Sequence, residues 1–300
     1  MTAIEVIDTA FTQLVRADAG LERHYDQCLW AEGPVWFGDG GYLVWSDIPN
    51  NRMLRFVPGL GVSEFRSPSN FVNGNYRDLS GRLLSCSHGA RALLRTEPDG
   101  SVTTLVDRYL GKRLNSPNDV VVKSDGTIWF TDPPYGILSN YEGYQSEQEQ
   151  DGCYVYRFDP ADGSLSVVAD DFAKPNGLAF SPDESTLYIS DTGRSHDADW
   201  PSHIRAFAVD GKRLSQPRVF ADIDHGLPDG FRVDAAGNVW TSTGIGVNVY
   251  DPAGALLGRI LTGVKTSNVT FGGPQRSTLY ITASKCLYSI AVLSTGVQRP

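Results

Sequence analysis

Four side chains with oxygen ligands recur at comparable places along the chain. Glu32 precedes two turn-forming residues and an apolar run, and a similar run follows Asn118, Asn176 and Asp229. Hard oxygen ligands favour Ca²⁺ over softer metals, and amides add ligands without the repulsion that further carboxylates would bring. We expect these four side chains to converge on one cation, Ca²⁺ first, with Zn²⁺, Mg²⁺ and Mn²⁺ as other candidates. In the alternative interpretation they hydrogen-bond to one another and only define the beginnings of repeats.

A cation with open positions suggests hydrolytic chemistry. Such an ion polarises a carbonyl group and stabilises the oxyanion that forms when water attacks. A base must take a proton from that water, and Asp229 and His88 are the candidates. His88 stands beside Gly89, where a structural hydrogen bond is the alternative role. Arg113 is a candidate for holding a polyhydroxyl or carboxylate group of a substrate, with a surface salt bridge as its alternative.

The elements that would position these residues are short β-strands. Runs rich in β-branched and aromatic residues follow tight-turn signals, and no long segment has a sustained helical period. Candidate first residues of a repeat lie 39 to 58 residues apart, at Glu32, Asn73, Asn118, Asn176, Asp229 and Asn268. One four-stranded propeller blade spans ~40–50 residues. The sequence therefore predicts an all-β fold, a six-bladed β-propeller with four-stranded antiparallel blades around a central channel.

The predicted strand order places the chemistry on one face of the ring. Because consecutive strands are antiparallel, the start of each inner strand shares a face with the loop after the second strand. The second strands end on this face at Asp47, His88, Asp132, Asp191, Thr243 and Ser284. Two long loops, 133–151 with Tyr135 and 192–202, are interpreted as walls or a lid over the channel mouth. Surface loops without a role are the alternative.

One domain is expected over residues 1–300, with 1–20 as an N-terminal extension and 21–300 as the propeller. The last blade needs an outer strand, because the residues after Val292 are few and polar. Residues 21–25 or residues 4–7 could return to this blade. Either segment would close the ring and remove the last sheet edge.

The composition limits the possible function classes. A net charge of −9 argues against a nucleic-acid partner, since such proteins carry basic patches. The four cysteines lie far apart, so we interpret them as buried small apolar residues rather than as disulfides or zinc ligands. The N-terminal residues do not read as a signal peptide, and no run approaches the ~20 apolar residues of a membrane helix. A cytoplasmic protein without a membrane partner is expected, and its oligomeric state is not predicted.

Several of these runs resemble one known family. The runs are 30–37 (WAEGPVWF), 115–122 (NSPNDVVV), 129–136 (WFTDPPYG), 174–180 (KPNGLAF) and 227–231 (LPDGF). They are similar to the gluconolactonase and regucalcin family, also called the senescence marker protein family, from about residue 21 to 291. The best fit is to the bacterial gluconolactonases, whose long loop resembles 142–144 (EGY) and 147–150 (EQEQ) here.

The resemblance implies a six-bladed propeller with one divalent ion, commonly Ca²⁺, in its channel. It implies that Glu32, Asn176 and Asp229 are ligands, that Asn118 binds substrate or metal, and that Asp229 is an acid or base. Animal members carry an arginine two residues before the Asn118 position, where this chain has Ser116. Arg113 or a loop tyrosine such as Tyr135 is the candidate to replace that sugar contact.

These observations predict a metal-dependent hydrolase that opens sugar lactones such as glucono-1,5-lactone to the aldonic acid. Two alternatives remain open at this stage. One is a hydrolase of other esters or of organophosphates on the same scaffold, for which the same oxyanion chemistry applies. The other is a propeller that binds sugar or calcium without catalysis.

Overall fold

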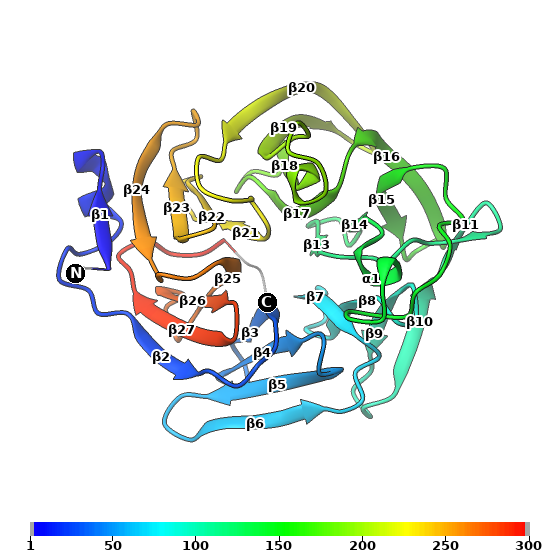
Figure 1. The fold of residues 1–300 in the computed structure, drawn as a ribbon, viewed down its shortest axis with the longest axis horizontal. Helices are drawn as coiled ribbons and strands as arrows, with labels where there is room; N and C mark the ends of the chain where they lie inside the picture. Colours follow the sequence, from blue (N-terminus) through cyan, green and yellow to red (C-terminus); the bar gives the residue numbers. More distant parts are fainter. Residues whose placement is uncertain (1–2, 298–300) are drawn as a thin grey trace.

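Six antiparallel sheets stand around a central axis, as the ribbon in Figure 1 shows. The computed structural model describes residues 3–297. The first blade consists of β3 (Ala31–Phe37), β4 (Tyr42–Asp47), β5 (Arg52–Val57) and β6 (Gly61–Arg66). The second consists of β7 (Val72–Arg77), β8 (Leu83–Ser87), β9 (Ala92–Thr96) and β10 (Val102–Val106). A small hairpin follows, with β11 (Arg108–Tyr109) and β12 (Lys112–Arg113).

The two enlarged repeats form the third and fourth blades. The third consists of β13 (Val120–Val122), β14 (Ile128–Asp132), β15 (Cys153–Asp159) and β16 (Ser164–Phe172), with α1 (Tyr135–Leu138) in the loop after β14. The fourth consists of β17 (Pro175–Phe180), β18 (Thr186–Asp191), β19 (His203–Asp210) and β20 (Arg213–Asp222). The turn η2 (Gly193–Ser195) follows β18. The extra residues therefore lie in loops after second strands, as the sequence predicted.

The N-terminal segment completes the last two blades. The fifth contains β21 (Phe231–Val233), β22 (Val239–Ser242), β23 (Gly246–Tyr250) and β24 (Leu256–Leu261), with β1 (Ile4–Val6) as a fifth strand. The sixth contains β25 (Thr266–Gly272), β26 (Thr278–Ala283), β27 (Cys286–Ala291) and, as its outer strand, β2 (Glu22–Tyr25). The six-bladed all-β propeller is confirmed. Of the two candidate closing segments, the one near residue 22 closes the ring, and Ile4–Val6 pairs with the neighbouring blade.

The segment between β1 and β2 is anchored by one aromatic side chain. The turn η1 (Thr9–Gln13) begins after Asp8, whose side chain accepts a hydrogen bond from the Ala10 amide. Phe11 is fully buried and lies so close to Gly258 that a Cβ there would stand 2.2 Å from its ring. Residues 1–2 and 298–300, which the predicted domain boundaries include, lie outside the described residues.

The apolar core is divided into clusters between neighbouring blades. Trp36 and Trp45 of the first blade pack with Tyr280 of the sixth, for example, and similar clusters join the other neighbouring pairs. Trp45, Trp129 and Trp240 from second strands are fully buried in this way. Since each cluster needs residues from two blades, the blades stabilise one another and the ring holds its inner strands in fixed positions.

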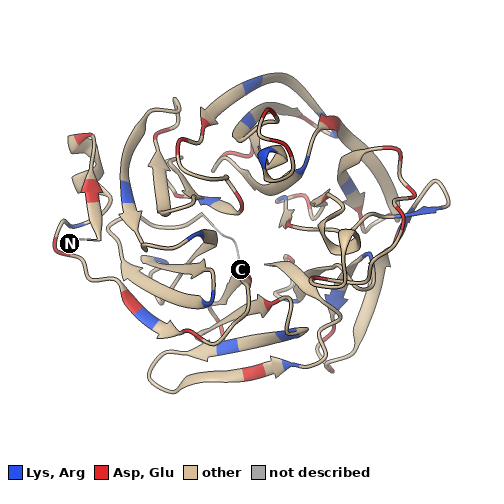
Figure 2. Cartoon of the chain, in the orientation of Figure 1, with Lys and Arg blue, Asp and Glu red and all other residues tan. Residues whose placement is uncertain are grey.

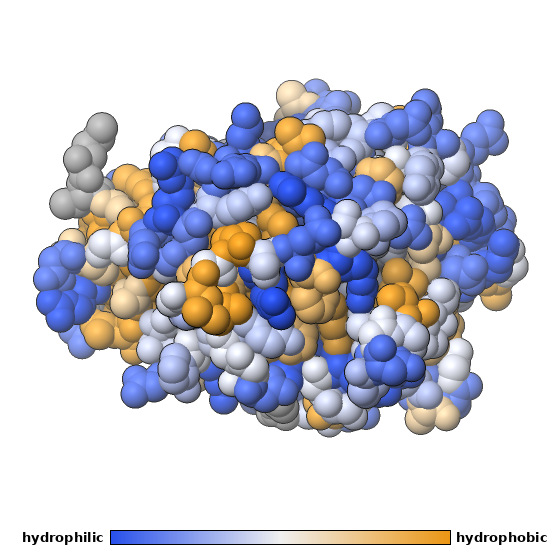
Figure 3. Space-filling model, turned by 90° about the horizontal axis from the view of Figure 1, so that it is seen from below, coloured by the Kyte–Doolittle hydropathy of each residue, from blue (hydrophilic) through white to orange (hydrophobic). Residues whose placement is uncertain are grey.

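Charged residues of both signs are distributed over the ring. Acidic and basic residues are interspersed around the ring in Figure 2. The side of the disc in Figure 3 shows hydrophilic residues with smaller groups of apolar ones between them. Among residues 3–297, no helix is long and apolar enough to cross a membrane. Three of the four cysteines are buried and all four are free, which agrees with their interpretation as small apolar residues.

Two nested truncations test how the ring is closed. A chain that begins at residue 27 lacks β2, so the backbone edge of β27 is exposed. We expect it to aggregate and to melt at least ~10 °C below the full chain, since 1 kcal/mol corresponds to roughly 2–4 °C at this chain size. A chain that begins at residue 8 keeps β2 and should melt cooperatively within a few degrees of the full chain. Equal melting temperatures for the two truncations in differential scanning calorimetry would contradict this role of β2.

Candidate active site at the channel mouth

The inner strands begin around a cavity of about 200 Å³ at one mouth of the channel. The predicted residues Glu32, Asn118, Asn176, Asp229 and Tyr135 all line it. The rest of the lining comprises Trp30, Ile48, Asn73, Tyr141, Glu142, Thr192, Ser195, Leu227 and Lys265. Oxygen-bearing side chains from four separate blades therefore meet at one place, as the convergence hypothesis requires.

Buried aspartates at the ends of second strands hold the segments that carry these residues. Asp47 Oδ1 accepts a hydrogen bond from the Leu29 amide at 2.9 Å, three residues before Glu32. Asp132 Oδ2 accepts from the Asn115 amide at 2.8 Å, three residues before Asn118. In the fourth blade Asp191 accepts from the amides of Ala173 and Lys174, which come just before Asn176. In three blades, the same kind of contact therefore fixes the backbone two or three residues before a side chain that lines the cavity.

Hydroxyl groups one residue earlier on the second strands connect each of these blades to the next. Ser46 Oγ donates to the Asn73 carbonyl at 2.7 Å, Thr131 Oγ1 to the Asn176 carbonyl at 2.7 Å, and Ser190 Oγ to the Asp229 carbonyl at 3.0 Å. These bonds are fully buried or nearly so, where hydrogen bonds are electrostatically strong. They fix the backbone of residues whose side chains enter the cavity.

Close backbone approach at the strand starts requires glycine after two of the cavity residues. Gly33 has φ +54°, and a Cβ there would lie 2.1 Å from the Asn73 carbonyl oxygen. Gly177 donates its amide to the Asp229 carbonyl at 3.0 Å, and a Cβ would lie 2.4 Å from that oxygen. The Glu-Gly and Asn-Gly pairs in the sequence therefore have a steric cause.

Two carboxyl groups in the cavity have raised pKa values, and burial is the main cause for both. Glu32 is 4% exposed, and burial together with the charge of Asp229 holds its pKa well above the ordinary value. Glu32 Oε2 accepts hydrogen bonds from the Gly33 amide at 2.5 Å and from Asn268 Nδ2 at 3.1 Å. Burial raises the pKa of Asp229 to about 6, although Lys265 and the Asn176 amide act in the opposite direction. Part of Asp229 still faces the open cavity.

The two long loops supply the outer wall. Tyr135, in α1, contacts Thr192 Oγ1 at 2.7 Å and Ser195 Oγ at 2.9 Å through its hydroxyl group, so the two loops are joined at the cavity rim. Burial and then the charge of Asp229 raise the pKa of Glu142 to about 7. Lys265 lies 4.9 Å from the centre of the Trp30 ring and lowers the pKa of both Asp229 and Glu142.

Two predicted residues do not line the cavity. His88 is 1% exposed and lies behind the wall, with Nδ1 2.9 Å from the Glu142 carbonyl and Nε2 3.2 Å from Asn73 Nδ2. Burial lowers the pKa of His88 to about 4. Arg113 lies on the hairpin outside the ring and donates to the Ala90 carbonyl at 2.8 Å. Neither side chain reaches the cavity, whereas Tyr135, the other candidate for the missing sugar contact, does.

Other cavity residues were not predicted as site residues. Asn73 occupies the matching repeat position, and that position was the signal that could have placed it in the site. Glu142, Thr192 and Ser195 come from loops without a regular period, so only loop closure brings them to the cavity. Ser116 is fully buried and donates to the Pro133 carbonyl at 2.6 Å, which makes it a support of the loop.

The cavity residues fit a hard divalent cation. Burial raises the pKa of both Glu32 and Asp229, and the charge of Asp229 raises that of Glu32 further, so a cation beside them would relieve this cost. Within residues 3–297 no group of three or more His, Cys, Asp or Glu residues is arranged to hold a metal, so a cation here would also need amide oxygens. Asn118 and Asn176 provide such oxygens in the same cavity.

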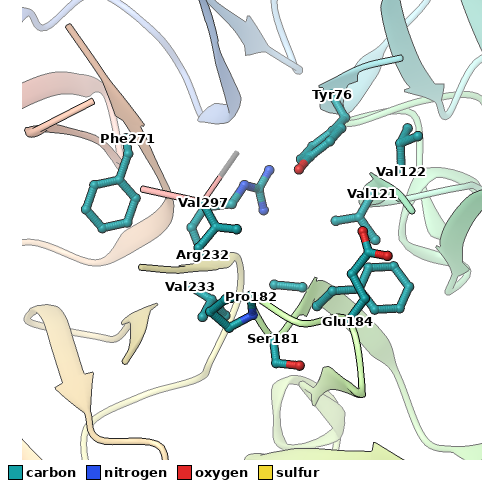
Figure 4. A pocket seen from close by; sticks show the side chains of 12 residues that line it. Tyr76, Val121, Val122, Ser181, Pro182, Glu184, Arg232, Val233, Phe271 and Val297 are labelled. Carbon is teal, nitrogen blue, oxygen red and sulfur yellow. The ribbon is translucent and has the colours of Figure 1, made fainter. Parts of the chain in front are cut away.

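Two other hollows of the described residues differ from this cavity in size or in the pairing of their charged residues. A cavity of about 50 Å³ lies where the inner strands end, and Figure 4 shows Arg232, Tyr76 and Val121 around it. A space of this size admits water molecules but not a sugar. A wider groove of about 560 Å³ is lined by Trp36, Asp39 and Arg77 among others, and Arg77 forms an ion pair with Asp39 at 3.1 Å. The mouth that holds Glu32 and Asp229 is therefore the candidate site.

The fold and the cavity together define a β-propeller with an acidic, amide-lined site at one mouth of its channel. Residues 30–285 match the family described as SMP-30/Gluconolactonase/LRE-like region, and the chain belongs to this family. The resemblance seen in the sequence is thereby confirmed.

Relatives of known name cover most of the chain. The gluconolactonase of Zymomonas mobilis is 35% identical over 292 residues, which is 89% of this chain and 80% of that protein. The solved structure of a gluconolactonase from Xanthomonas campestris has a TM-score of 0.90 and 43% identity, covering 96% of this chain and 94% of that one. The pentonolactonase of Haloferax volcanii is 28% identical over 265 residues, or 86% of this chain and 82% of that protein.

The raised pKa of Asp229 predicts a stabilising substitution in the metal-free protein. The pKa of Asp229 is about 6 in the folded protein and ~3.9 in the unfolded chain. The contribution of this group to the free energy of unfolding is therefore most favourable at low pH and is lost as the pH rises through 6. Asp229→Asn should therefore stabilise the metal-free protein at pH 7.5 by about 1–2 kcal/mol, allowing for solvent in the cavity. The difference should shrink toward pH 4.

This outcome is measured by thermal melting with a chelator present, between pH 4 and 8. Asp170, which is exposed on β16, provides the matched control, since Asp170→Asn should leave the melting temperature nearly unchanged. An Asp229→Asn variant less stable than the unsubstituted protein at pH 7.5 would show that the carboxylate is stabilised by contacts rather than destabilised by burial.

Proposed function

We propose that this protein hydrolyses sugar lactones such as glucono-1,5-lactone to the corresponding aldonic acids. The observation that carries the proposal is the meeting of Glu32, Asn118, Asn176 and Asp229 in one cavity at the channel mouth. Relatives named gluconolactonase support it, because they align with most of this chain. The cavity of about 200 Å³ is below the usual range for drug-sized ligands and suits a small one such as a single sugar ring.

A divalent cation, Ca²⁺ first, completes the proposed site. Glu32, Asn176 and Asp229 would hold it, with Asn118 as a further ligand or as a contact to substrate. When bound, the cation supplies a positive charge that polarises the lactone carbonyl and stabilises the developing oxyanion. The support for this part is the all-oxygen donor set together with the raised pKa of Glu32 and of Asp229, for which burial is the main cause.

The protein side chains perform the remaining steps. Asp229 takes the proton of the attacking water, because burial raises its pKa to about 6, close to working pH, and solvent still reaches it. Glu142, with a pKa of about 7, belongs to the loop wall and not to the set of residues that would hold the cation. Tyr135, held by Thr192 and Ser195, presents its hydroxyl group at the rim and contacts the sugar. The walls formed by both long loops limit the water around the ester.

Chelation and one substitution test this mechanism. Lactone hydrolysis, followed in a pH-stat against the spontaneous rate, should be lost after exhaustive chelation and should return with added Ca²⁺. Asp229→Asn should lower kcat by about 100-fold or more, the usual range for a lost general base. Asp170→Asn, remote on β16, should leave the rate unchanged.

The outcome that would reject the mechanism is full activity in the chelated protein together with full activity of Asp229→Asn. A panel that adds aryl esters and an organophosphate to the lactones separates the alternative hydrolases from the lactonase. Binding of Ca²⁺ without hydrolysis of any substrate in the panel would favour the alternative of a propeller that binds sugar or calcium without catalysis.

A further inference from the structure

Asn73 carries a buried oxygen without a partner in the wall of the candidate site. The residue lines the cavity and is only 5% exposed. Within residues 3–297 its Oδ1 makes no hydrogen bond. A buried acceptor without a hydrogen-bond donor destabilises the folded protein by about 1–3 kcal/mol. In the wall of a binding cavity, such an atom is a candidate to accept a hydrogen bond from a ligand.

The orientation of the Asn73 amide is determined by His88. Nδ1 of His88 lies 2.9 Å from the carbonyl oxygen of Glu142, and a carbonyl oxygen only accepts, so Nδ1 carries the proton. Burial lowers the pKa of His88 to about 4, which leaves the ring neutral at pH 7 and Nε2 free to accept. Nε2 therefore accepts from Asn73 Nδ2 at 3.2 Å, and Oδ1 is turned away from the ring.

The same histidine, which follows β8, packs against the loop that covers the cavity. Gly136, in α1, packs against it so closely that a Cβ would lie 2.4 Å from the His88 Cβ. The Gly136 amide donates to Ser116 Oγ at 2.9 Å, which holds this turn of the loop in place. His88 thus connects the wall that contains Glu142 with the amide of Asn73, and a substrate enclosed by that wall meets both.

We propose that Asn73 Oδ1 accepts a hydrogen bond from a hydroxyl group of the sugar lactone, and that His88 is a positioning residue that fixes the Asn73 amide for this contact. The inference rests on the proposed lactonase function. A lactone sugar brings hydroxyl donors that need acceptors when they leave water. The three residues proposed to hold the cation, and Asn118, belong to other blades. Asn73 is joined instead, through His88, to the loop wall that a substrate must touch. Asn73 thus favours hydroxylated lactones over plain ones.

Asn73→Ala tests the contact with two substrates that share a six-membered ester ring. Glucono-1,5-lactone carries hydroxyl groups, and δ-valerolactone carries none. We expect kcat/KM for glucono-1,5-lactone to fall by about 3- to 10-fold, mainly through KM, as for a lost neutral hydrogen bond. The value for δ-valerolactone should change less than about twofold. If its turnover is too slow to measure, its inhibition constant against glucono-1,5-lactone replaces KM.

The two proposals fail in different ways. If the unsubstituted protein hydrolyses neither lactone, the proposed lactonase function is wrong. Turnover by that protein with an equal loss on both lactones in Asn73→Ala would overturn the hydroxyl contact. A fall in Ca²⁺ affinity of the variant, measured by calorimetry, would also overturn it, since Asn73 would then be a ligand of the cation.

Two substitutions at His88 test the positioning role. His88→Gln keeps one donor and one acceptor at the end of the side chain, and His88→Leu keeps neither. The preference is the ratio of kcat/KM for glucono-1,5-lactone to that for δ-valerolactone. We expect His88→Leu to lower this ratio by the same factor as Asn73→Ala, and His88→Gln to keep most of the ratio of the unsubstituted protein. Equal preference in both His88 variants and the unsubstituted protein would overturn the positioning role, and melting temperatures show whether each variant is folded.

Discussion

A buried hydroxyl and carboxyl pair at the end of the second strand is the contact on which the site depends. In the first blade Ser46 holds the Asn73 carbonyl and Asp47 holds the amide of Leu29, and the third and fourth blades repeat both contacts. One bond reaches the next blade, and the other reaches the segment that enters its own inner strand. Because these groups are out of water, leaving either unpaired is costly, and the positions of the cavity residues become rigid.

This rigidity allows a destabilising arrangement of charge. Glu32 and Asp229 come from the first and fifth blades, yet they share one cavity, where burial raises the pKa of both and the charge of Asp229 raises that of Glu32 further. A flexible pair of loops would separate two such groups. The ring of interblade cores prevents this, since every blade is packed on both sides. Such strain in a site is expected where a ligand is to supply the missing interaction.

The enlarged loops turn an open channel mouth into a walled cavity. Tyr135 joins the two loops through Thr192 and Ser195, and His88 attaches one of them to the second blade. The propeller provides fixed positions for the candidate ligands, and the loops provide the outer wall of the cavity. This division is common in folds where a rigid scaffold carries loops that vary.

The sequence by itself determined the repeat and the blade number, and it predicted which oxygen-bearing residues meet at the channel mouth, because Glu32, Asn118, Asn176 and Asp229 occupy matching positions in their repeats. It also indicated β2 as one candidate to close the ring. The tertiary structure decided the contacts that have no period. It placed Glu142 and Lys265 at the cavity, turned Arg113 outward, and put His88 behind Asn73. Those outcomes depend on how loops from different blades close over one another, and distances in space between such segments are not recorded in spacing along the chain.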